Sequence, residues 1–329
     1  MEKVIIFTHG NDIDGIGCEL LCMMAFHEIT VVHASNVSEL ETKFREYIEN
    51  GKLDSFEQIF VTDLALYNPS LEMVINSPSL SKKVLVFDHH KSGIGIYDKP
   101  GFVTIKDEVD GRKTCGTELF YKYLCDSGFL TRTKALDQFV ELTRLEDTWE
   151  WKEALDKGEK AHDLAVLFNA LGIENYVGAL FPKISNDTEN FEFNDEESKI
   201  IATKKAEYLR TLDSIWSEAE FFIDGLGNKY AALFSAYEYR NELAEYVRKL
   251  KIEGLKYLIM IAWDKGLFGQ KSYRSIEENF NVALIAEAHG GNGHVAASSV
   301  NITEEQKEKA LTLSKRESLE YLVNSSYKE

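Results

Sequence analysis

Short apolar runs alternate along the chain with segments whose apolar residues recur every three or four positions. Apolar runs with the length of buried β-strands lie at residues 4–7, 30–33, 59–61 and 84–87. Helical spacing follows or separates these runs at residues 16–28, 38–49, 67–75, 114–125 and 134–145. Strands that alternate with helices are typical of βαβ units. We therefore predict an α/β fold whose N-terminal part is a doubly wound, mainly parallel sheet.

A polar segment beginning at residue 185 separates this part from a second set of elements. A long helix is predicted at about residues 197–220, as a connector between two domains. Beyond it, strands are predicted at residues 230–234, 257–262 and 269–273, and helices at 241–250, 281–288 and from 304 onward. The expected organisation is a first domain over residues 1–185, a linker and connecting helix over 186–226, and a smaller α/β domain over 227–329.

Residues that can bind metal ions follow three of the predicted strands. They are His9, Asp12 and Asp14 after the first strand, Asp63 after the third, and Asp88, His89 and His90 at the fourth. Ligands of open α/β sheets bind beyond the carboxyl ends of the strands, so we expect these groups at one edge. Each aspartate alone reads as a helix cap or turn residue. Four aspartates and three histidines together exceed what capping needs, and they predict a metal site.

The donor types indicate the metal and the reaction. Carboxylates mixed with imidazoles, without a cysteine, favour Mn²⁺, Fe²⁺ or Zn²⁺ over a thiolate zinc site. Two ions about 3.5–4 Å apart need a bridging carboxylate and are typical of phosphoester hydrolysis. Such a pair activates a water molecule and neutralises charge that grows on the phosphoryl oxygens.

Charge and composition then limit the substrate and the compartment. A formal net charge of -18 repels long nucleic acid but permits a small anion at a local cationic centre. No apolar run approaches the roughly 20 residues that cross a membrane, and the N-terminus lacks a signal-peptide pattern. Cys18, Cys22, Cys115 and Cys125 form no CxxC pair and are expected to be small buried thiols. We therefore expect a cytoplasmic protein with no membrane partner.

These motifs together resemble those of the DHH phosphoesterase superfamily. The resemblance rests on Asp88-His89-His90, on Asp12, Asp14 and Gly15, on Thr62-Asp63, and on Asp147 in 'RLEDTWEW' as the fourth motif. The C-terminal 'SYRSIEENFNVALIAEAHGGNGHVAAS' is similar to the DHHA1 substrate-binding domain. The superfamily includes RecJ-type exonucleases, family II pyrophosphatases and the oligoribonucleases called nanoRNases. The short first motif resembles the nanoRNase branch most.

The resemblance implies a role for each matching residue of the first domain. Asp63 would bridge two divalent ions, with Mn²⁺ as the preferred metal. His9 and Asp12 would complete one ion site, and Asp14, His89 and Asp147 the other. His90 would contact the phosphate and, with Asp63 and Asp88, form the catalytic set. His9 precedes Asp12 by three residues rather than the two or four of many family members, so Asn11 or a water molecule is the alternative ligand.

The resemblance also implies a substrate-binding set in the second domain. It comprises Arg274, Ser275, Gly290, Gly291, Gly293 and His294. Taken alone, the glycine run fits a helix C-cap and turn, and an arginine is more often part of a surface ion pair. A glycine loop can also approach a phosphate closely, because no Cβ intervenes. Trp149 and Trp151 follow Asp147 directly; they could stack on a base, but we expect core positions for both.

The function expected from these observations is hydrolysis of very short oligonucleotides, or linear dinucleotides, to 5′-mononucleotides. The alternatives are a phosphatase acting on pAp, a cyclic-dinucleotide phosphodiesterase and a non-catalytic nucleotide-binding module. The complete carboxylate set argues against the last, because a binding module needs no activated water. The sequence does not rank the three substrates securely, and it leaves a homodimer open.

Overall fold

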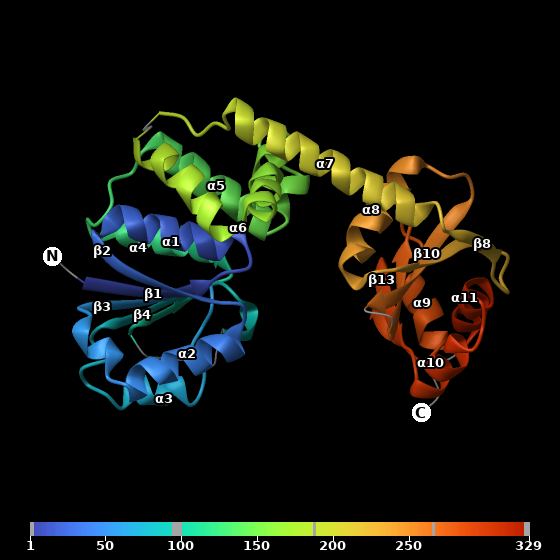
Figure 1. The fold of residues 1–329 in the computed structure, drawn as a ribbon, viewed down its shortest axis with the longest axis horizontal. Helices are drawn as coiled ribbons and strands as arrows, with labels where there is room; N and C mark the ends of the chain where they lie inside the picture. The colour runs from blue at the N-terminus through green and yellow to red at the C-terminus, as the bar shows by residue number, and fades with distance from the viewer. Residues whose placement is uncertain (1–2, 94–100, 187–188, 265–266, 326–329) are drawn as a thin grey trace. The chain divides into compact units, whose positions relative to one another are not determined.

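A computed structural model of the chain describes residues 3–93, 101–186, 189–264 and 267–325 (Figure 1). The chain divides into two units, Met1–Lys204 and Lys205–Glu329. The division falls inside the long helix α7 (Asp195–Trp216), which lies within the range expected to hold the linker and connecting helix. Residues 187 and 188 of the polar segment lie outside the described residues.

The first unit is built on a five-stranded parallel sheet with the order β2-β1-β3-β4-β5. Its strands are β1 (Lys3–His9), β2 (Glu28–Ala34), β3 (Gln58–Thr62), β4 (Val84–Asp88) and β5 (Val103–Ile105). A two-stranded hairpin follows, β6 (Glu108–Val109) with β7 (Arg112–Lys113). The central strands are buried on both faces, because helices cover the sheet on two sides. This confirms the predicted parallel α/β sheet.

Two separate cores cover the two faces of this sheet (Figure 1). One face carries α1 (Ile13–Ala25), α4 (Gly116–Asp126), α5 (Lys134–Asp147) and α6 (Gly158–Asn186). The other carries α2 (Val37–Glu49) and α3 (Ser70–Ile75). Asp12 caps the N-terminus of α1 by accepting a hydrogen bond from the Gly15 amide, so the first helix begins directly at the end of β1.

Helix α6 is the largest element that the sequence pattern does not predict. It consists of two helical segments that meet at Gly172, whose φ of 69° and ψ of 171° are not helical. By length and composition α6 could cross a membrane, so the expectation that no segment reaches that length is wrong. The apolar residues of α6, including Leu167, Phe168 and Tyr176, contribute to the core of the first unit. Only 28% of the most apolar stretch of α6 is buried, so α6 contributes side chains to the core without being a wholly buried helix.

The second unit contains a six-stranded mixed sheet with the order β12-β13-β11-β10-β9-β8. Its elements are β8 (Glu220–Ile223), β9 (Lys229–Ser235), α8 (Arg240–Leu250), β10 (Leu255–Asp264), β11 (Leu267–Ser275), α9 (Val282–Ala288), β12 (Asn292–His294), β13 (Ala297–Asn301), α10 (Glu304–Leu311) and α11 (Lys315–Asn324). Only β9 and β10 pair in parallel among the described strands of this sheet. This is the smaller α/β unit that the sequence predicts.

Two predicted boundaries in this part of the chain are wrong. The connecting helix ends at Trp216 rather than near residue 220, because the chain turns there and pairs with β9 as strand β8. The C-terminal helix is two helices, since Ser314 caps a new one and Glu317 closes a capping box. The glycine run ends α9, as the helix C-cap interpretation expects, because the amides of Gly290 and Gly291 donate to the carbonyls of Glu287 and Ala286, and the chain then enters the β12–β13 hairpin.

The aromatic packing beneath the site leads to a stability prediction. Phe120 of α4 is fully buried, and its ring lies 4.9 Å from Phe60 and 5.5 Å from Phe87, centroid to centroid. Phe120→Ala should lower the free energy of unfolding by about 3–5 kcal/mol, because it leaves a cavity. Phe120→Leu should cost less than about 1.5 kcal/mol. Urea denaturation followed by circular dichroism measures both, and equal losses for the two variants would contradict this packing.

Candidate metal centre

The predicted metal-binding residues meet at the carboxyl edge of the parallel sheet. His9 is the last residue of β1, Asp63 follows β3, and Asp88 ends β4. Asp12 and Asp14 lie at the start of α1, and Asp147 is the last residue of α5. Parallel strands bring these positions to the same edge, as the sequence analysis expects.

Their ligand atoms form two groups, one of His9, Asp12 and Asp63 and one of Asp14, His89 and Asp147, and a third group of Asp63, His89 and His90 joins them. In the first group, the Nδ1 of His9 lies 2.6 Å from the Oδ2 of Asp12 and 3.5 Å from the Oδ2 of Asp63. In the second, the Nε2 of His89 lies 3.3 Å from the Oδ1 of Asp63 and 3.5 Å from the Oδ2 of Asp147. The two oxygens of Asp63 thus face opposite groups, as a bridging ligand would.

The same atoms are buried without hydrogen-bond partners. They are His9 Nδ1, both carboxylate oxygens of Asp63, His89 Nε2 and Asp147 Oδ2. A buried polar atom without a partner costs free energy, and a buried carboxylate without one costs more. Cations would satisfy all five atoms at once. The donor set therefore fits divalent metal ions, and among the described residues it contains no cysteine.

Asp63 also has an unusual backbone conformation. Its φ is 55°, in the left-handed region, which aspartate tolerates better than most residues. Its amide donates to the carbonyl of Phe87 on β4 at 2.8 Å, which holds the turn against the next strand. The chain therefore leaves β3 sharply at Asp63, and the carboxylate is placed between the two donor groups.

Asp14 is fully buried, and the N-terminus of α4 holds it. The amides of Gly116 and Thr117 donate to its two carboxylate oxygens at 2.7 and 2.8 Å. The positive end of a helix dipole stabilises a carboxylate at this position. Its Oδ2 still lies 3.7 Å from the Nε2 of His89, so Asp14 belongs to the second donor group.

The electrostatics reflect many carboxylates in one buried place. Burial, together with the charges of Asp14 and Asp12, raises the pKa of Asp63 well above its usual range. Burial, and then the charge of Asp14, raises the pKa of Asp147 to about 7. The carboxylate of Asp12, in close contact with the Nδ1 of His9, raises the pKa of His9 to about 10. Without metal, the raised pKa values mean that these side chains bind protons more tightly than usual. A site that stabilises protons in this way also favours other cations.

The orientation of His9 distinguishes it from its neighbour Asn11. The Nε2 of His9 donates to the carbonyl of Ser35 at 3.3 Å, which leaves Nδ1 facing Asp12 and Asp63. A ligand histidine commonly donates its other ring nitrogen in this way. Asn11 is exposed and donates to the same carbonyl. The structure therefore places His9, not Asn11, in the donor group despite its shifted spacing.

His90 lies at the solvent side of the cluster. Its Nδ1 is 2.7 Å from the Oδ1 of Asp88, and about half of its side chain is exposed. Asp88 is buried and also accepts from the amide of His89 at 2.9 Å, so it does not face the two donor groups directly. Asp88 thus orients His90, and a ring nitrogen of His90 also lies close to ligand atoms of Asp63 and His89.

A buried arginine that the sequence analysis missed anchors the Asp147 turn. Arg144, one turn before Asp147, is 3% exposed and pairs with Glu141 and Glu150. It also donates to the carbonyl of Lys113 at 3.1 Å. An arginine at a helical position carries no motif, so its charge alone suggests a solvated face. Only the tertiary contacts identify it as part of the frame of the site.

Trp149 corrects one sequence prediction. It was expected in the core, but 54% of its surface is exposed, whereas Trp151 is half-buried and packs against the core of the first unit. The cysteine prediction is close to the structure: Cys18, Cys22 and Cys115 are buried, Cys125 is half-buried, and all four are free.

The predicted substrate-binding residues all lie in the second unit. Arg274 on β11 pairs with Ala297 on β13, which pairs in turn with His294 on β12. Directly paired residues have their side chains on the same face of a sheet, so Arg274 and His294 share one face. Arg274 donates to the Oδ1 of Asn241 and to the carbonyl of Tyr273, and His294 is exposed. Ser275 donates to the carbonyl of Glu277.

The glycines of this hairpin are required by its backbone. A Cβ on Gly291 would lie 2.1 Å from the carbonyl oxygen of Ser299, and one on Gly293 would lie 2.5 Å from the Cα of Ser298. Gly290 and Gly293 have φ values of 83° and 146°. Close strand packing thus accounts for these glycines without any ligand. A ligand could still contact the side chain of His294, which is exposed.

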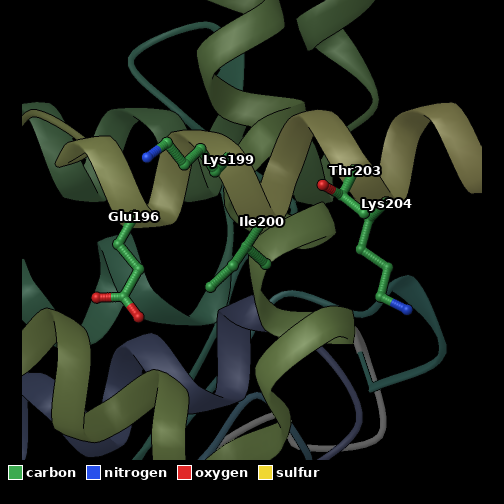
Figure 2. Close-up of a pocket in the computed structure, with 5 residues that line it drawn as sticks. All are labelled: Glu196, Lys199, Ile200, Thr203 and Lys204. Atoms are coloured by element: carbon green, nitrogen blue, oxygen red, sulfur yellow. The ribbon is translucent and has the colours of Figure 1, made fainter.

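A shallow recess on α7 is separate from these residues. It is lined by Glu196, Lys199, Ile200, Thr203 and Lys204 (Figure 2). These residues recur at helical spacing on one face of α7, and Ile200 packs against the core of the first unit. The recess contributes none of the metal-binding donors.

Comparisons with known proteins identify the family of the chain. The model of the DHH family, N-terminal domain, matches residues 3–144. The chain is 31% identical over 304 residues to oligoribonuclease NrnB of Bacillus subtilis (strain 168), covering 91% of this chain and 73% of that protein.

Two solved structures share the fold at low identity. One is the pGpG-specific phosphodiesterase PggH of Vibrio cholerae, with a TM-score of 0.52 and 14% identity, covering 99% of this chain and 100% of that one. The other is the DHH domain of a member of the s1p family of ribosomal proteins, with a TM-score of 0.56 and 12% identity, covering 99% and 88%. With a curated relative aligned along most of its length, the chain belongs to the DHH family of metal-dependent phosphoesterases.

Proposed function

We propose that this protein is a phosphodiesterase that hydrolyses very short oligonucleotides and linear dinucleotides to 5′-mononucleotides. The observation that carries the proposal is the pair of donor groups joined by Asp63, whose buried ligand atoms have no hydrogen-bond partner. Two divalent ions, with Mn²⁺ as the expected metal, fit this arrangement. The relative named an oligoribonuclease supports the substrate class, and the free thiols support a reducing, cytoplasmic location.

Each part of the site has a distinct task in this reaction. When bound, the ions would supply positive charge to the phosphoryl oxygens and lower the pKa of a water molecule for attack. Asp63 would join the two ion sites, with His9 and Asp12 on one side and His89 and Asp147 on the other. His90, oriented by Asp88, would donate from Nε2 to a phosphoryl oxygen as negative charge grows there.

The second unit is proposed to hold another part of the substrate. Arg274 and His294 both pair with Ala297, from the two strands on either side of it, and so lie on one face of the mixed sheet. His294 is exposed. We propose that they contact a phosphate or ribose group, with Ser275 and the glycine hairpin shaping the backbone around it. This assignment rests on the resemblance of their motif to the DHHA1 domain.

The first prediction tests the bridging role of Asp63. Asp63→Asn should lower kcat by about 10³-fold or more. Asp63 would serve both ion sites, and removing one member of a set of residues that act together abolishes most of the activity of the whole set. Asparagine tolerates the left-handed backbone, so the fold should persist. Without metal, Asp63→Asn should melt higher than the wild type, because one buried carboxylate has been removed from a repelling cluster.

Thermal unfolding with and without Mn²⁺ measures this directly, and the exposed Asp156→Asn is the control. Mn²⁺ should raise the melting temperature of the wild type and of the control, but have little effect on Asp63→Asn. Full stabilisation of Asp63→Asn by Mn²⁺, with wild-type turnover, would rule out the bridging role.

A second prediction concerns Gly116, which separates Asp14 from Asp63. A Cβ at Gly116 would lie 2.8 Å from the Cβ of Asp63 and 3.0 Å from the Oδ2 of Asp14. Gly116→Ala should therefore weaken Mn²⁺ binding about 10- to 100-fold by moving the ligands while the helix forms normally. The control is Gly178→Ala, a helical glycine with nothing within 4 Å of the added carbon. Calorimetric titration of Mn²⁺ should separate the two variants, and equal affinities would contradict the prediction.

A third prediction concerns substrate length. Each nucleotide beyond the first few must extend over a protein of net charge -18, which repels phosphate. We expect kcat/KM to be highest for substrates of about two to five nucleotides and to fall for longer ones. A length series of RNA at fixed salt and Mn²⁺, with pAp and a cyclic dinucleotide alongside, tests this. Equal efficiency on a 24-nucleotide RNA, or faster hydrolysis of pAp or the cyclic compound, would overturn the assignment.

A further inference from the structure

The segment that follows Asp147 exposes a tryptophan in a strained backbone conformation. Trp149 has a φ of 63° and a ψ of 8°, and 54% of its surface is exposed. The left-handed region is unfavourable for a bulky side chain, and exposure of an indole is unfavourable in water. The left-handed conformation ends α5, where the amide of Trp149 donates to the carbonyl of Glu146 at 3.1 Å, but glycine usually occupies this position, and the exposed indole is not needed for it. Strained residues of this kind cluster at ligand-binding sites.

The residues on both sides of Trp149 are held in place. Before it, the hydroxyl of Thr148 donates to the carbonyl of Arg144 at 2.8 Å. After it, Glu150 pairs with the guanidinium of the buried Arg144, so Arg144 holds one end of the turn through its backbone carbonyl and the other through its side chain. The ring of Trp151 stacks on His162 at 4.4 Å between centroids, with an interplanar angle of 15°. The turn is therefore fixed while the indole of Trp149 remains in solvent.

Gly158, at the start of α6, adds to this frame. A Cβ on Gly158 would lie only 1.9 Å from the carbonyl oxygen of Trp151. The start of α6 thus lies directly against the turn, and only glycine permits that approach. The rigidity of the segment is a property of its packing, which does not use the Trp149 side chain.

A cation accompanies the exposed indole. The Nζ of Lys152 lies 4.6 Å from the centroid of the Trp149 ring. A cation at this distance orients an aromatic ring through its π face. In a protein with a net charge of -18, an exposed aromatic ring with a lysine beside the metal centre is suited to a nucleotide, which has a flat base and an anionic phosphate.

Trp149 is also close enough to the metal centre to contact a substrate there. Only Thr148 separates it from Asp147 in sequence, so the two Cα atoms lie within about 7.6 Å of each other. Asp147 Oδ2 in turn lies 3.5 Å from the Nε2 of His89. A base attached to a phosphodiester at this centre is thus within reach of the indole.

We propose that Trp149 stacks on a nucleobase next to the hydrolysed phosphodiester. The inference rests on the proposed function and names the part of the substrate that the first unit recognises. Because every base presents a π face, this contact selects nucleotides without selecting a sequence. It distinguishes nucleotidyl substrates from phosphoesters that carry no base.

The test compares ligands with and without a base. Binding of 5′-AMP and of ribose 5-phosphate is measured by calorimetry on the full-length protein with Mn²⁺. The variants are Trp149→Gly, which removes the ring and suits the φ of 63°, and Trp149→Phe, which keeps an aromatic face. The control is Leu155→Ala, which removes a fully exposed apolar side chain from the same segment.

Trp149→Gly should weaken 5′-AMP binding about 5- to 100-fold and leave ribose 5-phosphate unchanged. Trp149→Phe should restore much of the affinity, and Leu155→Ala should match the wild type. The melting temperature of Trp149→Gly should not fall, because the substitution relieves strain. Equal loss for both ligands, no loss for either, or no 5′-AMP binding by the wild type would overturn the proposal.

Turnover separates this inference from the proposed function. Hydrolysis of the dinucleotide ApA by the wild type tests the proposed function, whatever the variants do. In Trp149→Gly, the KM for ApA should rise with little change in kcat, since stacking persists from the bound state to the transition state. If the wild type cleaves ApA and Trp149→Gly has the same KM, the stacking inference fails while the proposed function stands.

Discussion

The site depends on a carboxylate that is buried without hydrogen-bond donors. Asp63 is 1% exposed, both of its oxygens lack partners, and other carboxylates surround it. Such an arrangement is unfavourable unless cations are present. The free-energy cost of burial falls on only a few atoms, because neighbouring carboxylates have hydrogen-bond donors. Amides at the start of α4 donate to Asp14. The amide of His89 and the ring of His90 bind Asp88. Within the donor groups, the buried carboxylate oxygens without hydrogen-bond partners belong to Asp63 and Asp147.

The parallel sheet is what makes this concentration of charge feasible. A parallel sheet places the carboxyl ends of its strands at one edge, so three separate turns deliver ligands to the same place. Helices on both faces bury the strands, and the turns between strand and helix are the remaining polar positions. Asp12 serves as both helix cap and metal-binding candidate, so the local structure and the site use the same side chain.

Much of this could be predicted from the sequence, because it follows local patterns. Apolar runs gave the strands, and residues such as Asp63 and His89 stood where strands end. What could not be predicted depends on contacts between distant segments. Arg144 looks like a surface charge until Lys113 and Glu150 are brought to it, and α6 loses its helical period at Gly172. Trp149 was assigned to the core because composition does not report which way a turn faces.

The acidity of the protein and its anionic substrate are compatible once charge is considered locally. The net charge of -18 is distributed over the whole chain, whereas the donor groups concentrate carboxylates where divalent ions would neutralise them. With the carboxylates neutralised, a short substrate would meet a centre that no longer repels phosphate, whereas a long one would extend over the rest of an acidic protein. An aromatic face such as Trp149 adds affinity that does not depend on charge. Stacking on a base could therefore add affinity on a protein whose net negative charge would oppose further contacts to phosphate.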